Sequence, residues 1–195
     1  MSEKTKLPQN LSFTYETDRL ILKILTPEYR YKVRDFLYQN RFVFEKYEPS
    51  VPENYYTPDF QHALLKYEFQ LALKLSNVRF YVFLKEKPDT IIGTVCLHNI
   101  IKMPYFSSEI GYKFDNHYWH HGYAREALSF VTSLGFDNLG LHKIFARCMP
   151  DNTPSRKLLL SIGFTEEGLE RDCTLIQGKW QDHIRYALIN HSSNK

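Results

Sequence analysis

Residues 108–127, SEIGYKFDNHYWHHGYAREA, constrain the fold more than any other stretch of this chain. Side chains alternate over residues 108–114, which predicts a strand with Glu109 on one face and Tyr112 on the other. An aromatic-rich turn follows, and from Tyr123 onward the apolar residues recur at helical spacing. A strand, a small-residue turn and a helix start leave several backbone N–H groups pointing outward beside the positive end of a helix dipole. The stretch therefore predicts an anion site, and phosphate is the usual occupant of such sites.

Local patterns predict the order of the other elements. Strands are expected at residues 19–25, 79–84, 91–99, 108–114, 142–148, 164–176 and 180–189, and helices at residues 26–40, 58–76, 123–138 and 151–162. A terminal strand at residues 11–15 is a further option. The strands between 79 and 114 are joined by too few residues for a parallel crossover, so they must be antiparallel. The helix at 123–138 allows strand 142–148 to run parallel to strand 108–114. We expect an α/β fold of the α+β type, with a mixed, mainly antiparallel sheet of about seven strands flanked by about four helices.

Two segments in the first half of the chain have distinctive composition. Residues 41–57 are rich in aromatic side chains and have little periodicity, which predicts a long loop that forms the wall of a pocket. The helix that follows carries an apolar stripe that we assign to the core: Phe60, Leu64, Tyr67, Leu71 and Leu75.

Composition limits the class of function. The net charge is +3, from 25 basic and 22 acidic side chains. The sequence has no block of like charge of the kind that binds nucleic acid directly, so we expect no such binding. The chain has no apolar run long enough to span a membrane or to direct secretion, so we expect a cytoplasmic protein. Its three cysteines have no paired spacing, which argues against disulfides and against a metal site. We expect one domain over residues 16–190, between tails at residues 1–15 and 191–195.

The turn around Gly122 also approaches the glycine motif of dinucleotide-binding proteins. That motif places its first glycine directly after the strand, whereas residues 115–121 intervene here. The antiparallel strands upstream have no place in a doubly wound parallel sheet. A nucleotide-dependent oxidoreductase is therefore disfavoured.

The turn sequence Trp-His-His-Gly-Tyr-Ala at residues 119–124 is followed by Asn152-x-x-Ser155 and then by Gly163-Phe164. In this order the motifs resemble those of the GNAT N-acetyltransferases. The similarity is greatest to the Rim-type branch, which acetylates the N-terminal alanine of ribosomal proteins. The motifs typical of that branch are Arg-Leu, Glu-x-Gly-Tyr, Gly-Tyr-Ala-x-Glu-Ala and Gly-Lys-Trp-x-Asp, and they stand here at residues 19–20, 109–112, 122–127 and 178–182.

The resemblance implies how acetyl-CoA is bound. Strand 108–114 should splay away from strand 142–148, so that the pantetheine arm pairs with the free strand edge and the pyrophosphate lies on the N–H groups of the turn. The residues so assigned are Ile110, Tyr112, Phe114, His121, Gly122, Tyr123, Ala124, Arg125 and Asn152. Arg125 has an alternative role as a solvated helix-face side chain, and Asn152 has one as a helix N-cap. His120 stands where the branch often has glycine or asparagine.

Glu109 is our candidate general base, because an α-amino group, with a pKa of about 8, needs only a modest base to attack a thioester. A backbone N–H near Tyr112 should polarise the thioester carbonyl. The alternative for Glu109 is an ion pair with an arginine. Ser155 resembles the serine offered as the acid in this branch, and its alternative role is that of a first-turn helix serine. Leu159 stands where many GNAT members carry a catalytic tyrosine, and Cys173 has no neighbouring base in the sequence that would make it a nucleophile.

The acceptor is expected to bind between the loop at residues 41–58 and the hairpin at 164–182, with Tyr47, Arg171 and Asp182 as candidate contacts. Two arrangements are open: Arg171 and Asp182 pair across the hairpin, or Asp182 holds a cationic acceptor. The predicted acceptor is the N-terminal alanine or serine of a protein, and a small amine or an antibiotic is the alternative. A sensor that binds acyl-CoA without turnover is a non-enzymatic alternative, favoured by Leu159. The many aromatic residues leave a homodimer open.

Overall fold

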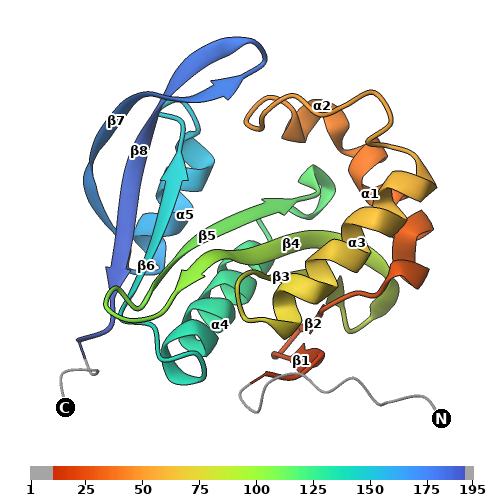
Figure 1. Cartoon of the computed structure of the whole chain (residues 1–195), viewed down its shortest axis with the longest axis horizontal. Coiled ribbons are helices and arrows are strands. Elements are labelled where there is room, and N and C mark those ends of the chain that lie inside the picture. The colour runs from red at the N-terminus through yellow and green to blue at the C-terminus, as the bar shows by residue number, and fades with distance from the viewer. Residues whose placement is uncertain (1–10, 192–195) are drawn as a thin grey trace.

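A computed structural model describes residues 11–191 of the chain. Its centre is one sheet of eight strands in the order β1-β2-β3-β4-β5-β6-β8-β7 (Figure 1). The strands are β1 Thr14–Glu16, β2 Leu20–Lys23, β3 Val78–Leu84, β4 Lys87–Ile101, β5 Ser107–Phe114, β6 Lys143–Cys148, β7 Thr165–Ile176 and β8 Lys179–Ile189. The α-helices are α1 Arg30–Gln39, α2 Arg41–Phe44, α3 Pro58–Leu73, α4 Tyr123–Asp137 and α5 Thr153–Ser161, with 3₁₀ turns at η1 Pro27–Tyr29 and η2 Asn116–Tyr118.

The sheet opens between β5 and β6, which are its parallel pair. Across these two fully described strands the pairing covers Ser107–Glu109 opposite Lys143–Phe145 and then ends. Beyond this point β5 continues toward Phe114 while β6 turns away with the β7–β8 hairpin, as Figure 1 shows. The predicted splay is therefore confirmed, and it leaves one edge of β5 facing a gap.

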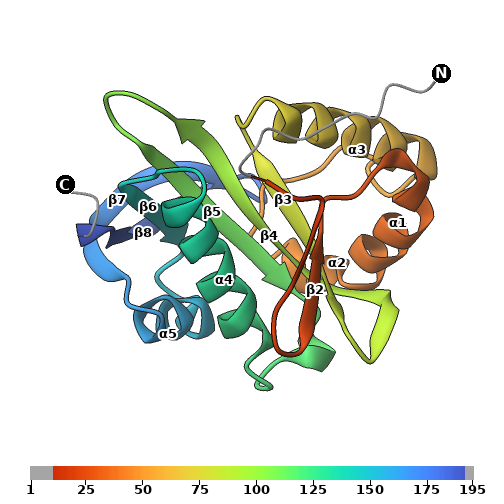
Figure 2. The same ribbon diagram turned by 90° about the horizontal axis from the view of Figure 1, so that it is seen from below.

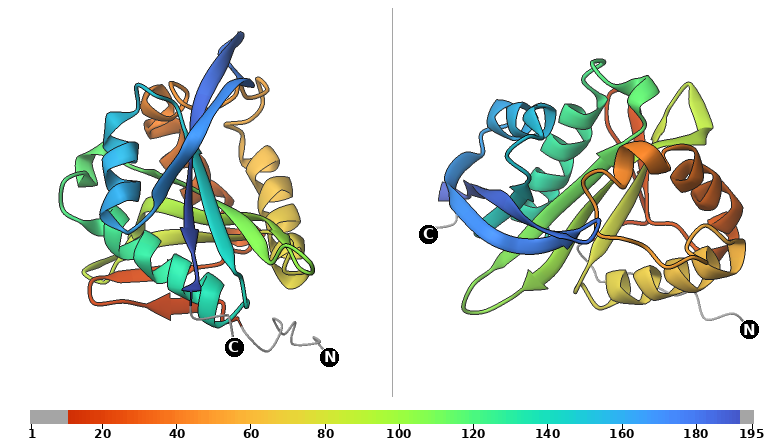
Figure 3. Two further views of the ribbon diagram at one scale, coloured as in Figure 1. Left: turned by 90° about the vertical axis from the view of Figure 1, so that its left-hand side faces the viewer. Right: turned by 90° about the horizontal axis from the view of Figure 1, so that it is seen from above.

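Helices cover both faces of the sheet. The first three helices, α1 to α3, lie on one face, and α4 and α5 lie on the other (Figures 2 and 3). Each face has its own core. Ile110 and Phe114 of β5 are buried with α4 residues such as Val131, whereas Val33 of α1 and Leu65 of α3 are buried with the opposite face. The alternation predicted for β5 is therefore observed, and Glu109 lies on the face of α1 to α3.

The fold class is confirmed, and the differences are local. The edge strand β1 begins within the segment that we assigned to the N-terminal tail, which makes eight strands rather than about seven. A short helix, α2, begins the stretch predicted as an irregular loop. The remainder of the two predicted tails, residues 1–10 and 192–195, lies outside the described residues.

The apolar stripe predicted for α3 is wrong in one respect. Tyr67 has 61 % of its surface exposed, whereas Leu65 and Ala72 are buried. The reason is polar: Glu68 accepts hydrogen bonds from Arg79 and Tyr81 of β3, so the helix is rotated to bury that carboxylate against the sheet. Within residues 11–191, no helix has both the length and the apolar character needed to cross a membrane.

Candidate active site

The turn between β5 and α4, residues 114–126, is built around Gly122 and is called the Gly122 turn below. Gly122 has a φ of 79° and precedes the first residue of α4, so the first N–H groups of the helix face outward. The indole Nε1 of Trp119 donates to the carbonyl oxygen of Phe114 at 2.9 Å, which closes the turn onto the end of β5. His120 has a φ of 63°, in the left-handed region that glycine and asparagine favour.

Arg19, at the start of β2, ties the Gly122 turn to the sheet. Its Nε lies 2.7 Å from Glu126 Oε2, its Nη1 donates to the carbonyl oxygen of His121 at 2.9 Å, and its guanidinium lies 4.7 Å from the ring centre of Tyr123. Thr17 Oγ1 also donates to Glu126, at 2.6 Å. Partial burial works to raise the pKa of Glu126, but these hydrogen bonds outweigh it and lower that pKa below its ordinary value. The turn is thus held in place by an ion pair from a distant strand.

Sequence reasoning missed this ion pair, although both partners stood in motifs that we noted. Arg19 belongs to the Arg-Leu pair and Glu126 to Gly-Tyr-Ala-x-Glu-Ala. Two motifs that each contain one charge of opposite sign were the available signal, and the fold brings them into contact.

Two hydroxyl groups, one on β5 and one on α5, meet beyond the point where β5 and β6 separate. Tyr112 projects from β5, and its hydroxyl oxygen lies 2.7 Å from Ser155 Oγ in the first turn of α5. Asn152 Oδ1 accepts a hydrogen bond from the backbone N–H of Ser155 at 3.2 Å, so Asn152 does cap this helix. Leu159, one turn later, is fully buried in the core, and packing explains the leucine at that position.

Glu109 lies on the other face of β5 and makes the ion pair that we held open as its alternative role. Arg147 Nη1 of β6 lies 2.8 Å from Glu109 Oε2, and Arg147 Nε also binds Glu170 of β7. Partial burial disfavours the charged guanidinium, yet the hydrogen bond to Glu170 and the charge of Glu109 raise the pKa of Arg147 above its ordinary value. Arg147 therefore bridges two carboxylates.

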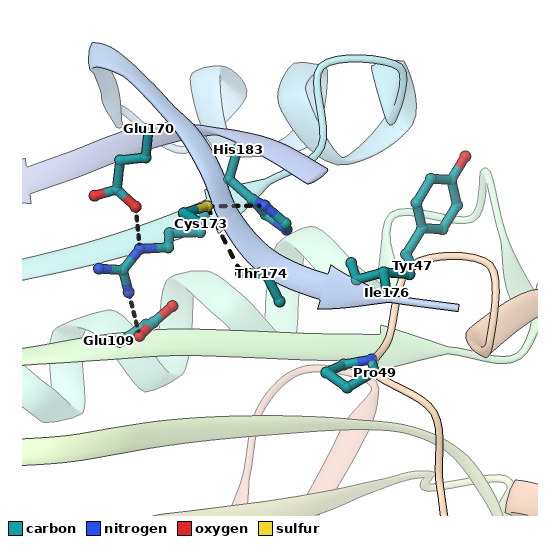
Figure 4. A pocket seen from close by; sticks show the side chains of 9 residues that line it. Tyr47, Pro49, Glu109, Glu170, Cys173, Thr174, Ile176 and His183 are labelled. Carbon is teal, nitrogen blue, oxygen red and sulfur yellow. Dashed lines mark hydrogen bonds and ion pairs between the residues drawn. The ribbon is translucent and has the colours of Figure 1, made fainter. Parts of the chain in front are cut away.

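A cavity of about 480 Å³ opens beside this bridge and is called the Glu109 cavity below. It lies between the loop after α2 and the β7–β8 hairpin, as Figure 4 shows. Its lining residues are Tyr47, Pro49, Glu109, Arg147, Glu170, Cys173, Thr174, Ile176 and His183. The volume falls within the usual range for small-ligand sites. Of the predicted site residues, Tyr47 and Glu109 are brought together here.

Two contacts fix the loop wall of the Glu109 cavity. Lys113 of β5 binds Glu48 at 2.7 Å, and the side chain of Gln177 in the hairpin turn donates to the carbonyl oxygen of Glu45 at 3.1 Å. Burial lowers the pKa of Lys113, and the charge of Glu48 opposes that effect. The loop that carries Tyr47 is thus joined both to β5 and to the turn of the hairpin.

The two other predicted acceptor contacts lie elsewhere. Arg171 is exposed and does not line the cavity, and within residues 11–191 no ion pair joins it to Asp182. Asp182 Oδ1 accepts a hydrogen bond from the backbone N–H of Asp172 at 2.8 Å. An irregularity between Glu170 and Thr174 shifts the β7–β8 register and turns Asp182 to this role.

The fold gives Cys173 an imidazole neighbour that no local sequence feature indicates. Cys173 Sγ lies 3.3 Å from His183 Nδ1, because β8 runs beside β7 and brings the imidazole to the thiol. Arg147, Glu170 and His183 were all missed as cavity residues, since no local pattern marks them. Among residues 11–191, no group of three or more His, Cys, Asp or Glu side chains is arranged to hold a metal ion.

Comparison with known proteins gives a consistent picture. The model of the acetyltransferase (GNAT) domain family matches residues 19–165. The probable N-acetyltransferase YjcK of Bacillus subtilis is 33 % identical over 152 residues, which span 78 % of this chain and 83 % of that protein. Ribosomal-protein-S5-alanine acetyltransferase from Vibrio fischeri has a similar structure, with a TM-score of 0.88 and 27 % identity over 94 % of this chain and 100 % of that one. Mycobacterium smegmatis RimJ in complex with CoA-disulfide shares the fold, with a TM-score of 0.83 and 23 % identity over 90 % of this chain and 84 % of that one.

Proposed function

The chain belongs to the GNAT acetyltransferase family and is an acetyl-CoA-dependent N-acetyltransferase; we propose that its acceptor is the N-terminal amine of a protein that begins with alanine or serine. The observation that carries this proposal is the Glu109 cavity, which places a carboxylate beside the point where β5 and β6 separate. The relative from Vibrio fischeri, named for the alanine of ribosomal protein S5, supports the choice of acceptor.

On the donor side, the free edge of β5 at residues 110–114 pairs with the pantetheine arm of acetyl-CoA, and the Gly122 turn binds the pyrophosphate. The features that fit this assignment are the end of β5–β6 pairing at Glu109 and the outward N–H groups at the start of α4. Gly122 suits the role because glycine adopts its left-handed conformation readily, and a Cβ there would lie 3.4 Å from Arg19 Nη2, which packs against the turn. Ile110, Tyr112 and Phe114 contribute main-chain contacts, since their side chains face the α4 core.

On the acceptor side, Glu109 takes the proton that the attacking amine loses. A cationic N-terminus entering the cavity replaces Arg147 at Glu109, while Arg147 keeps its second partner, Glu170. The amine nitrogen bonds to the acetyl carbon, the carbon–sulfur bond breaks, and its electron pair leaves with the CoA sulfur. A backbone N–H of β5 near Tyr112 polarises the carbonyl oxygen during this step. Because an α-amine has a pKa of about 8, a fraction of the acceptor molecules is already neutral near neutral pH, and a modest base such as Glu109 suffices for the rest.

The alternatives predicted from sequence receive less support. A sensor without turnover was favoured by Leu159, whose burial in the core now accounts for that residue. A small amine would also fit a cavity of about 480 Å³, but the wall built from a loop and a hairpin suits an extended peptide that enters between them.

The test is release of free CoA, detected with a thiol reagent, using acetyl-CoA and a panel of acceptors. We expect release with peptides that begin with alanine or serine, and none with the same peptides blocked by N-terminal acetylation. Release with small amines alone would overturn the proposed acceptor and keep the reaction. Mass spectrometry of the peptide product locates the acetyl group on the α-amine or on a lysine.

A further inference from the structure

The contact between Tyr112 and Ser155 is the one polar bridge that we describe across the gap between β5 and α5. The two hydroxyl oxygens are 2.7 Å apart, and the Tyr112 hydroxyl also lies 3.3 Å from the carbonyl oxygen of Ser155. Tyr112 is on the strand and Ser155 is on the helix, so the pair spans the place where the proposed donor site has its sulfur end.

The two hydroxyls share two protons, and their arrangement decides what Ser155 can do. If Ser155 donates to Tyr112, the Tyr112 proton points to the Ser155 carbonyl and no hydroxyl proton faces the gap. If Tyr112 donates to Ser155 Oγ, the Ser155 proton is released from Tyr112 and points either to the thiol of Cys148 or toward a ligand. An anionic ligand selects the second arrangement, because a hydrogen bond to a charged acceptor is stronger than one to a neutral acceptor.

Tyr112 is suited to be the donor in that arrangement. Burial raises the pKa of Tyr112 above its ordinary value, so its hydroxyl keeps its proton at neutral pH. Its ring packs against the core that contains α4, which fixes the direction of the hydroxyl. The backbone of Ser155 is fixed in turn by the Asn152 cap.

We propose that Tyr112 is a positioning residue that turns the Ser155 hydroxyl proton toward the sulfur of CoA, so that Ser155 donates a hydrogen bond to the leaving thiolate. This inference rests on the proposed donor site. It also gives Tyr112 a side-chain role in addition to the main-chain role in binding the pantetheine arm.

The pair donates a hydrogen bond and does not transfer a proton. A thiol like that of CoA has a reference pKa of about 8.5, against about 10 for tyrosine, so a proton moving from Tyr112 to the thiolate would go uphill. The carbon–sulfur bond breaks with its electrons on sulfur, the Ser155 hydroxyl stabilises that charge, and solvent supplies the proton after release. Both hydroxyls are unchanged at the end of the cycle.

Cys148 and Tyr186 are ionisable groups that act on Tyr112. Cys148 at the end of β6 has its pKa raised to about 11 by burial, against a hydrogen bond from Ser155 that works to lower it, so it is a neutral thiol at physiological pH. Tyr186 of β8 accepts from Arg156 Nε at 3.1 Å and donates to Glu166 at 3.0 Å, which directs its hydroxyl to a different partner set. Tyr186 is therefore a matched control: it is a buried tyrosine that contacts the same helix.

The test titrates the thiol of bound CoA by its thiolate absorbance in the ultraviolet, in the wild type and in Tyr112→Phe, Ser155→Ala and Tyr186→Phe variants. In the wild type we expect the titration midpoint of bound CoA to lie below that of free CoA. Ser155→Ala should return it to the free value, Tyr112→Phe should return it part of the way, and Tyr186→Phe should leave it unchanged. At a pH where bound CoA is a thiolate, Tyr112→Phe should weaken CoA binding about fivefold, with desulfo-CoA bound as tightly as by the wild type.

Two results would overturn the inference. Equal midpoints in the wild type and in Tyr112→Phe would show that Tyr112 does not act on the sulfur. An equal loss of affinity for CoA and desulfo-CoA would show a structural role alone. Failure of the wild type to bind either ligand would overturn this inference together with the donor site, whereas no acceptor enters the experiment, so the choice of acceptor is tested separately.

Discussion

The Gly122 turn and the Glu109 cavity lie at either end of the same strand, β5, and they are assembled in different ways. The turn is one continuous segment that needs a single distant strand, through Arg19, to hold it. The cavity draws its wall from a loop near residue 47 and from four strands, β5 to β8. A site made of one segment carries its signature in the sequence, and a site made of five does not. The comparison also assigns separate tasks, with donor binding at the turn and acceptor binding at the cavity.

The largest expected effect separates the two regions by chemistry. Glu109→Gln removes the proposed base and should lower kcat by about 10²- to 10³-fold, as loss of a general base commonly does, with acetyl-CoA binding unchanged. Initial rates of CoA release and calorimetric binding of acetyl-CoA measure the two quantities. Glu167→Gln is the control, because Glu167 pairs with Lys143 and Arg185 and does not line the cavity. Wild-type turnover in Glu109→Gln would remove Glu109 from the mechanism.

The next effect concerns how the free energy of unfolding depends on pH. His98 of β4 lies opposite Glu109, and a side chain at Gly111 would come within 2.9 Å of its Nε2, so the imidazole fills that space. Burial, helped by the charges of Arg79 and Lys113, lowers the pKa of His98 from 6.5 to about 4. As pH falls, the unfolded chain therefore takes up the His98 proton first, and stability on the order of 3 kcal/mol is lost between about pH 6.5 and pH 4.

Urea unfolding at pH 7 and pH 5 tests this expectation. The wild type should be less stable at pH 5, and His98→Leu should reduce the difference. Glu126 at the Gly122 turn affects stability in a more acidic range. Its pKa is lowered from 4.5, so its contribution to the free energy of unfolding is present above about pH 4.5 and is lost only below it. The stability lost between about pH 6.5 and pH 4.5 should therefore come from His98 and not from Glu126. An equal pH dependence in His98→Leu and wild type would contradict this assignment.

A smaller effect is expected at the turn itself. Arg19→Gln removes the ion pair to Glu126 and the hydrogen bond to the His121 carbonyl, so the Gly122 turn loses its anchor. We expect the dissociation constant of acetyl-CoA to rise about tenfold while the KM for the peptide stays the same. Lys32→Gln, which breaks the exposed pair with Asp89, serves as the control. A change in peptide KM without a change in acetyl-CoA binding would reverse the two assignments.

The smallest effect is expected where the hairpin turn contacts the loop after α2, at Gln177 and Glu45. Gln177→Ala removes the hydrogen bond that joins the hairpin turn to the carbonyl oxygen of Glu45. Since an exposed hydrogen bond contributes about 1 kcal/mol or less, the KM for the peptide should rise two- to fivefold, with acetyl-CoA binding unchanged. Gln70→Ala, an exposed change on α3, should alter neither constant. If Gln177→Ala likewise left both constants unchanged, the contact between Gln177 and Glu45 would have no part in acceptor binding.

The sequence predicted most of the fold because the relevant signals are local. Alternation in β5 located the buried side chains Ile110 and Phe114, and the glycine at 122 located the turn. Contacts between residues distant in the sequence could not be predicted in this way. Arg147 and His183 each lie on a strand whose neighbours are distant in sequence, and alternation gives the face of a side chain without naming its partner.

Two differences between the expected and the observed orientations have the same physical origin. The face of α3 was misjudged because the partly buried Glu68–Arg79 pair, and not apolar periodicity alone, orients that helix against the sheet. The expected pair between Arg171 and Asp182 is not formed, because the register shift in the β7–β8 hairpin presents Asp182 to the backbone of Asp172. In both cases one polar contact between distant residues decides an orientation that hydrophobic pattern leaves open.

The most direct test of the division between the two regions is hydrogen–deuterium exchange of the wild type with acetyl-CoA and, separately, with an alanine-starting peptide beside CoA. We predict that acetyl-CoA protects residues 110–114 and 121–126, and that the peptide adds protection at residues 45–49 and 170–183. Protection of the hairpin by acetyl-CoA alone, or protection of the Gly122 turn by the peptide alone, would contradict the account.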